Sequence, residues 1–135
     1  MKEIRKPIKN FEGLYEVSNF GCVYSLPRRY RRECKKLRLR VNTKGYPHVQ
    51  LYKDGKIFTF RVHRLVAETF LPNNSNKKEV NHIDGNKLNN ELNNLEWATS
   101  KENYDHAVKN NLKSKEWWYW IKKRGYFNHI KSLFR

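Results

Sequence analysis

The first 62 residues alternate short apolar runs with turn-forming residues, which is the pattern of short β-strands. Apolar runs at 14–17 and 22–26 are separated by small and polar residues. Two further runs, at 46–52 and 57–62, flank Asp54-Gly55, which is a strong signal for a two-residue hairpin turn. We therefore expect this part of the chain to form a small antiparallel β-sheet.

The hydrophobic period changes from two to about 3.6 after residue 61. Apolar or small residues then recur on one helical face, at Val62, Leu65, Val66, Thr69 and Phe70. Pro72 ends this predicted helix. Two short strands are predicted at 80–83 and 95–97, and Thr99 or Ser100 can cap a last helix. A sheet, a helix and a strand–strand–helix unit together predict an α+β fold.

The last 23 residues differ from the rest, because seven are Trp, Tyr or Phe and seven are Lys or Arg. We expect two short helices around Gly125 that pack on the domain through their aromatic side chains. The alternative is that some of these rings stack on nucleic-acid bases. We thus predict a β-rich module at 1–61, a linking helix and strand–strand–helix unit at 62–112, and an aromatic, basic tail at 113–135.

The charge of the chain narrows the class of its partner. The 29 Lys and Arg residues outnumber 13 Asp and Glu, for a formal net charge of +16, and an anionic partner such as a nucleic acid would screen it. No run approaches the roughly 18–20 apolar residues of a membrane span. The N-terminus lacks the apolar stretch of a signal peptide, and two cysteines do not make a disulfide framework. We expect a cytoplasmic protein with no membrane partner.

The densest positive charge lies in the basic segment, residues 28–40, whose only acid is Glu33. Its end alternates basic and apolar residues from Lys36 to Val41, which predicts a strand with one basic and one apolar face. Such a strand suits a DNA groove better than a bilayer; the alternative is a solvated charged edge that prevents aggregation. The candidate DNA-binding residues are Arg28, Arg29, Arg31, Arg32, Lys35, Lys36, Arg38 and Arg40.

One segment in the second half carries the candidate chemistry. His82 follows Asn81 at the end of a predicted strand, Asn94 lies twelve residues later, and Asn103 and His106 share one face of the last predicted helix. A strand–loop–strand–helix unit can bring these side chains to one point. The oxygens of the first and last asparagines could hold a hard divalent cation such as Mg²⁺, together with waters and phosphate. A neutral histidine beside that cation could accept a proton from water.

This segment resembles the HNH nuclease motif, a ββα-metal (His-Me finger) fold. Residues 6–26 resemble the DNA-binding module found before HNH domains, and residues 62–67 resemble the family's linking helix. The order of the three segments is similar to that of phage and intron-encoded HNH homing endonucleases. The resemblance implies an endonuclease that hydrolyses a phosphodiester bond of double-stranded DNA. It also implies a phage-encoded protein acting in the cytoplasm of a bacterial host.

The resemblance implies a role for each residue of the segment. His82 would be the general base that activates water, and Asn94 the structural residue that holds the loop around that base. Asn81 and Asn103 would hold a single Mg²⁺ or Mn²⁺, although many family members have Asp in place of Asn81. His106 would contact the scissile phosphate or support the site.

The resemblance further implies a monomer on DNA that nicks one strand and needs no small-molecule cofactor. Two alternative hypotheses belong to other classes. One is a DNA-binding regulatory or architectural protein with an inactive HNH site, which the neutral Asn81 favours. The other is an RNA-binding or RNA-cleaving protein, which the aromatic tail suggests.

Overall fold

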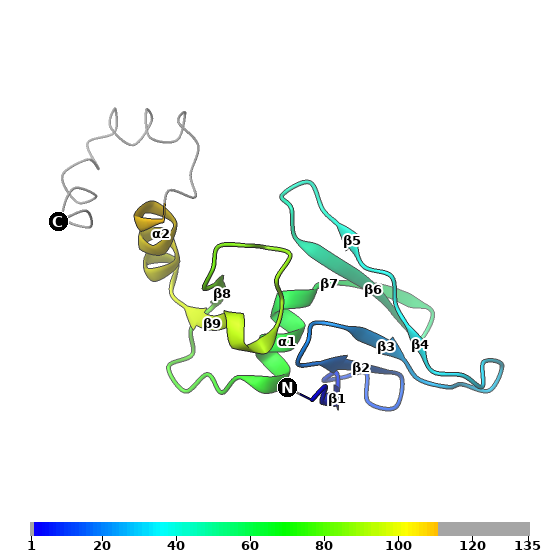
Figure 1. Ribbon diagram of the computed structural model, residues 1–135. Helices are drawn as coiled ribbons and strands as arrows, with labels where there is room; N and C mark the ends of the chain where they lie inside the picture. Colours follow the sequence, from blue (N-terminus) through cyan, green and yellow to red (C-terminus); the bar gives the residue numbers. More distant parts are fainter. Residues whose placement is uncertain (1, 111–135) are drawn as a thin grey trace.

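Seven strands precede residue 62 and form two antiparallel sheets, where the sequence predicted one (Figure 1). The computed structural model describes residues 2–110, so the predicted helices of the tail lie outside the described residues. The first sheet has the strand order β1-β2-β3-β4 and the second has the order β5-β6-β7. Their bounds are Arg5–Pro7 (β1), Tyr15–Ser18 (β2), Val23–Ser25 (β3), Lys35–Lys36 (β4), Arg40–Val41 (β5), Pro47–Lys53 (β6) and Lys56–Arg61 (β7).

The second half contains the predicted strand–strand–helix unit. Thr99 caps its last helix by accepting a hydrogen bond from the backbone N–H of Glu102 at 3.1 Å. Within residues 2–110, no helix has the length and apolar character needed to cross a membrane. The α+β fold class is confirmed. The elements are Val62–Phe70 (α1), Glu79–His82 (β8), Leu92–Asn94 (η1, a 3₁₀ turn), Leu95–Ala98 (β9) and Ser100–Lys109 (α2).

The prediction of one continuous strand from Lys36 to Val41 is wrong. The basic segment begins with a bridge between Arg28 and Arg31, then adds β4 to the first sheet and β5 to the second. Between these strands, Leu37 and Leu39 pack against the core, whereas their neighbours at 36, 38 and 40 are exposed. Because both leucines reach the core shared by the sheets, the chain crosses from the first sheet to the second here and adds one two-residue edge strand to each.

Strand β1 was not predicted, because its three residues are all exposed and show no apolar alternation. It pairs with β2 at the edge of the first sheet, with Lys6 opposite Val17. Pro7 fits there, since an edge strand tolerates a residue that cannot donate a backbone hydrogen bond. The strand therefore depends on its neighbour and not on its own hydrophobic pattern.

Helix α1 lies between the N-terminal sheets and the β8–β9 hairpin (Figure 1). It contacts β2, β6 and β7, and also β8, β9 and η1. Its buried side chains include Val62, Leu65 and Val66, and burying each of them contributes about 1.5–3 kcal/mol. The same helix therefore supplies one hydrophobic core to the sheets and to the strand–strand–helix unit.

Candidate functional site

A cavity of about 390 Å³ opens where β8, the turn after it and α2 meet. Four of the five predicted site residues line this cavity: Asn81, His82, Asn103 and His106. The fifth, Asn94, is buried and stands outside the lining. The fold thus brings the predicted chemistry together from a strand end and a helix face.

His82 ends strand β8 and is buried, with 6% of its surface exposed. Burial lowers the pKa of its imidazole below the ordinary 6.5, and Lys87 lowers it further. The contact with Asn90 and the charge of Asp84 oppose that shift. Because burial is the largest cause, His82 is uncharged at neutral pH and its ring can accept a proton.

Two further rings pack beside His82. The centroid of His63 lies 5.0 Å from that of His82, and the centroid of Tyr46 lies 5.1 Å from that of His63. Burial lowers the pKa of His63 to about 3, and nearby His82, Arg61 and Arg64 contribute to the same shift. His63 is therefore an uncharged ring that supports the wall behind His82 at physiological pH.

Asn94 ties down the loop that follows His82. Its Oδ1 accepts from the backbone N–H of Asp84 at 3.1 Å, and its Nδ2 donates to Asp84 Oδ1 at 2.9 Å and to the Asn89 carbonyl at 2.8 Å. Asp84 also accepts from the side chain of Asn89 and from the backbone N–H of Asn86. These bonds lower the pKa of Asp84, which keeps it ionised as the centre of the turn.

Each candidate metal-binding asparagine is held by a carboxylate. Asn81 Nδ2 donates to Glu96 Oε1 at 2.9 Å, and Asn103 Nδ2 donates to Glu79 Oε2 at 2.9 Å. Ser100 donates to the other oxygen of Glu79, and these two bonds lower the pKa of Glu79. Because a carboxylate only accepts, each amide must turn its nitrogen toward the glutamate and its oxygen away from it.

A hard divalent cation fits this set of donors. Within residues 2–110, no group of three or more His, Cys, Asp or Glu side chains could hold a metal ion. Asn81 and Asn103 both line the cavity, and each turns its amide oxygen away from the glutamate that its nitrogen contacts. Mg²⁺ commonly takes one or two protein oxygens and completes its shell with water and phosphate.

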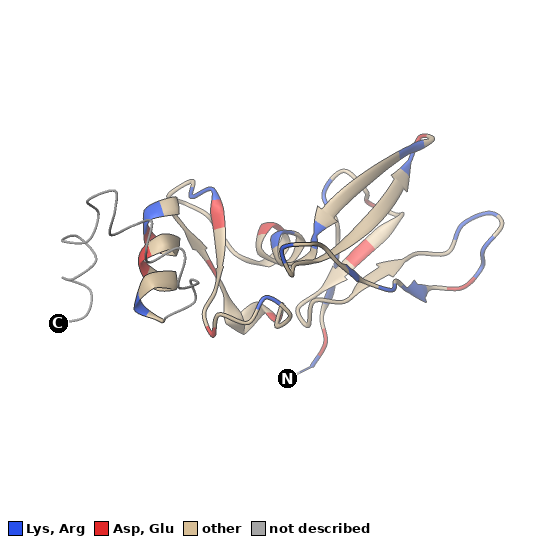
Figure 2. Cartoon of the chain, turned by 90° about the horizontal axis from the view of Figure 1, so that it is seen from above, with Lys and Arg blue, Asp and Glu red and all other residues tan. Residues whose placement is uncertain are grey.

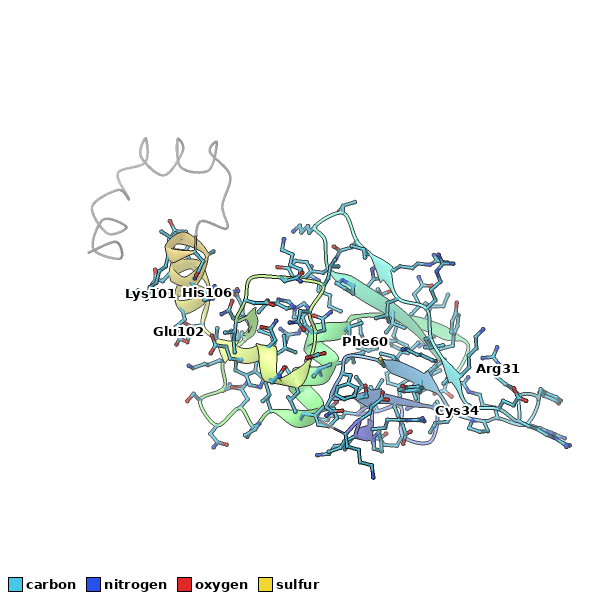
Figure 3. The ribbon with its side chains drawn as sticks, viewed as in Figure 1. Arg31, Cys34, Phe60, Lys101, Glu102 and His106 are labelled. Carbon is cyan, nitrogen blue, oxygen red and sulfur yellow. The ribbon has the colours of Figure 1, made fainter. Side chains whose placement is uncertain are left out.

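His106 connects α2 to the segment after β8. Its Nε2 donates to the carbonyl of Ile83 at 3.0 Å, so its ring points from α2 toward the loop beside His82 (Figure 3). This contact gives His106 a supporting position at the cavity wall. His106 and Ile83 are 23 residues apart in the sequence, which alone does not indicate that they are in contact.

The basic segment lies at the opposite end of the molecule from α2 (Figure 2). Figure 3 places Arg31 on this projecting end. Seven of the eight predicted DNA-binding residues in the basic segment are exposed. The eighth, Arg28, is half-buried, and its guanidinium lies 4.7 Å from the ring centre of Tyr15. The Nε and Nη2 atoms of Arg28 are buried without a hydrogen-bond partner within the described residues. The segment and the cavity are therefore two separate sites.

Sequence reasoning missed several residues that line the cavity or contact its lining. Asn90 contacts His82, Lys87 lines the wall, and Glu79 and Glu96 hold the asparagines. Asn90 stands in a run rich in asparagine, so its type alone did not distinguish it. The cross-strand register, which pairs Asn81 with Glu96, was the one signal that could have revealed a glutamate.

Comparison with known proteins identifies two family segments. Residues 3–52 match the NUMOD4 motif, and residues 60–104 match the HNH endonuclease family. DNA endonuclease I-HmuI of Bacillus phage SP01 is 44% identical over 103 residues, which are 76% of this chain and 56% of that protein. An uncharacterized HNH endonuclease of Acanthamoeba polyphaga mimivirus is 47% identical over 114 residues, or 82% of this chain and 26% of that protein. The chain thus spans about half or less of the length of these relatives.

A solved structure is also similar, that of DNA binding and cleavage by the HNH homing endonuclease I-HmuI. The TM-score is 0.74 at 38% sequence identity, and the match covers 91% of this chain and 67% of the other. The first match covers β1 to most of β6, and the second covers α1, β8, β9 and the first half of α2. This chain belongs to the HNH homing endonuclease family.

Proposed function

We propose that this protein is a metal-dependent DNA endonuclease whose active site is the cavity between β8 and α2. One observation carries the proposal: a buried, uncharged His82 shares that cavity with Asn81 and Asn103, whose oxygens face away from their carboxylate partners. The related protein I-HmuI is named a DNA endonuclease, and its structure is described as one of DNA binding and cleavage. The geometry and this relationship favour the same chemistry.

The reaction is hydrolysis of a phosphodiester. A ring nitrogen of His82 takes a proton from water while the water oxygen forms a bond to phosphorus and the P–O3′ bond breaks. The leaving O3′ takes a proton from a solvent water, so the products are a 5′-phosphate and a 3′-hydroxyl, and His82 then releases its proton to solvent. A divalent cation, Mg²⁺ or Mn²⁺, would offset the charge that develops on the phosphate and on the leaving oxygen.

The other site residues support this chemistry. Asn81 and Asn103 would hold the cation through their oxygens, and the neutral Asn81 makes the site less negative than an aspartate would. Asn94 holds the loop on which His82 depends, and His106 fixes α2 against that loop. His82, Asn94 and His106 therefore act as base, loop anchor and wall support.

Double-stranded DNA is the proposed substrate, and the basic segment is the proposed grip. Arg28, Arg31 and Lys35 line one cavity of about 370 Å³, and their cationic groups suit phosphate oxygens. Duplex DNA that contacted this end and the active site would run along the length of the molecule. A single active site in a monomer would nick one strand.

The second candidate function is a DNA-binding regulator with an inactive HNH site. The neutral Asn81 favours it, because an amide binds a divalent cation less strongly than a carboxylate does. Both functions share the basic segment and duplex DNA. They differ in whether a phosphodiester bond is broken.

A supercoiled-plasmid assay with Mg²⁺ and with Mn²⁺ separates them. The plasmid should carry DNA from the neighbourhood of the protein's own gene, and His82→Ala should be run beside the wild type. We expect open circles from the wild type and a rate about 10²–10⁴-fold lower from His82→Ala, with unchanged duplex binding by both. Tight, salt-sensitive binding without cleavage by the wild type would instead support the regulator.

A further inference from the structure

The turn between β2 and β3 packs directly on the loop that carries Asn90. The backbone N–H of Leu92 donates to the carbonyl of Asn19 at 2.8 Å. A Cβ added at Gly21 would lie 2.9 Å from the Asn90 carbonyl oxygen and 3.0 Å from Asn90 Cβ. Only a glycine permits this approach, so the N-terminal module and the loop touch through their backbones.

Asn90 in turn contacts His82. The Oδ1 atom of Asn90 lies 2.7 Å from Nε2 of His82, and both side chains are buried, with 5% and 6% of their surfaces exposed. A carboxamide oxygen can only accept, so Nε2 must carry the hydrogen of this bond. The Nδ1 atom is then the nitrogen with a free electron pair.

We propose that Asn90 is a positioning residue that fixes the ring orientation and tautomer of His82, and that the 19–21 turn holds Asn90 in place. The inference rests on the proposed function, in which His82 is the base. The N-terminal module then has a second role, because it supports the active site as well as gripping DNA. A catalytic ring misplaced by about 1 Å can slow a reaction about 10²-fold. A residue that touches His82 but not the substrate can therefore control the rate.

Two substitutions at Asn90 test the direct contact. Asn90→Asp keeps an acceptor at the same position, whereas Asn90→Ala removes it. Proton NMR without DNA should show a ring N–H signal of His82 that exchanges slowly with water, identified by its loss in His82→Ala. We expect Asn90→Asp to keep this signal and Asn90→Ala to lose it to fast exchange. A signal that survives in Asn90→Ala, or a wild-type ring with its hydrogen on Nδ1, would overturn the proposal.

Two glycines test the contact between the modules. Gly21 and Gly13 have nearly the same left-handed backbone, with φ of +80° and +78°, but nothing lies within 4 Å of a Cβ added at Gly13. An alanine at either position meets the same backbone strain, and only Gly21→Ala also displaces Asn90. We expect Gly21→Ala to lower kcat about tenfold or more and to speed exchange of the ring N–H. Gly13→Ala should leave both unchanged.

The affinity for duplex DNA separates positioning from a loss of fold. We expect Kd to stay unchanged in Gly21→Ala and Asn90→Ala while kcat falls. Identical kcat and N–H exchange in the two glycine variants would overturn the proposed role of the turn. If Gly21→Ala does not fold, Asn90→Asp and Asn90→Ala still test the contact between Asn90 and His82. A wild type that binds DNA without cutting it would overturn the proposed function, whereas the ring N–H comparison would still test Asn90.

Discussion

The basic segment and the cavity between β8 and α2 lie at opposite ends of the molecule and hold their side chains in opposite ways. Seven of the eight cations in the basic segment are exposed, and none of the eight donates a side-chain hydrogen bond within residues 2–110. In the cavity region, Asn81, Asn94 and Asn103 each have a partner at 3.1 Å or less. In the described chain, the first region presents unpaired positive charge to solvent, and the second holds its polar side chains in place through hydrogen bonds.

The functions proposed for the two regions account for this difference. Phosphates recur along any duplex, so free cations can meet them in many arrangements, and much of the affinity is independent of sequence. A reaction at one phosphorus requires groups held close to a single geometry by their neighbours. We therefore expect substitutions in the basic segment to act on affinity and substitutions at the cavity to act on rate, metal binding and stability.

The largest contrast should appear in stability, between Asn94→Ala and Arg29→Ala. Removing the Asn94 amide leaves the backbone of Asp84 and Asn89 without partners, which costs about 1–3 kcal/mol of unfolding free energy. Arg29 is exposed, and its replacement should change stability by less than about 0.5 kcal/mol. Urea unfolding of both variants measures this, and equal midpoints would remove the contrast.

Metal affinity should respond to the carboxylate behind Asn81. Glu96→Ala frees the amide to rotate and should weaken Mn²⁺ binding about tenfold in calorimetry, whereas Glu96→Gln keeps an acceptor and should lose less. Glu102→Ala is the matched control, because that carboxylate pairs with Lys77 at 3.0 Å and holds no asparagine.

Exchanging the donor and the acceptor between residues 81 and 96 gives a sharper test of the Asn81–Glu96 contact. Asn81→Asp alone places two carboxylates at a contact that is now 2.9 Å, and their repulsion should offset the gain of charge at the metal. Adding Glu96→Gln restores a donor and should make Mn²⁺ binding tighter than in either single variant. Independent, additive effects of the two substitutions would show that Glu96 does not act through Asn81.

Duplex affinity should respond at the other end of the molecule. Replacing Arg29 and Arg38 by Ala should weaken binding to all sequences alike and reduce the slope of log K against log salt by about one for each lost phosphate contact. The kcat at saturating DNA should not change. Lys101→Ala, on α2, is the control for removal of one exposed charge. An unchanged slope would favour a solvated edge as the role of the basic segment.

The pH dependence should be the smallest effect and should separate the two regions again. His82 acts as a base only when unprotonated, and its pKa is lowered from 6.5, so cleavage should persist at pH 6.5 and decline only below it. Arginine stays charged throughout this range, so duplex binding should remain flat. A cleavage rate that is level down to pH 4 would contradict the assignment of the base.

Stability should fall over the same acidic range. The unfolded chain binds protons at histidine near pH 6.5, whereas folded His63, with a pKa lowered to about 3, binds one only in strong acid. The stabilisation from this uncharged ring is therefore complete above pH 6.5 and is lost as the pH falls toward 3. His63→Phe, which cannot titrate, should flatten this part of a pH series of thermal midpoints.

Much of the fold was predictable because local patterns agreed with it. The apolar period of 3.6 marked α1 at its first residue, and Asp54-Gly55 marked the hairpin, where both residues have positive φ. Strand β1 escaped prediction because its exposed residues are ordered by pairing with β2. The basic segment forms two strands in different sheets and not one strand, because Leu37 and Leu39 pack into the core between the sheets.

The candidate site was predictable only in part, for a similar reason. His82 and the asparagines at 81, 94 and 103 stand in motif register, and three of these four meet at one cavity. Asn90 and Glu79 could not be found this way, because their importance depends on contacts with residues 8 and 24 positions away. Side chains that act through another residue leave no periodic pattern in a single sequence.

The shared burial of α1 has a consequence for how the chain comes apart. The two family motifs follow one another in the sequence, but both pack on α1. Exposing Val62, Leu65 and Val66 to solvent would therefore disrupt both motifs. A fragment that began at residue 62 would expose that face of α1 to water. A fragment that ended at residue 61 would lack α1, which covers its sheets. Heat or denaturant should therefore melt residues 2–110 in a single cooperative transition, and a protease should find no stable half to leave behind.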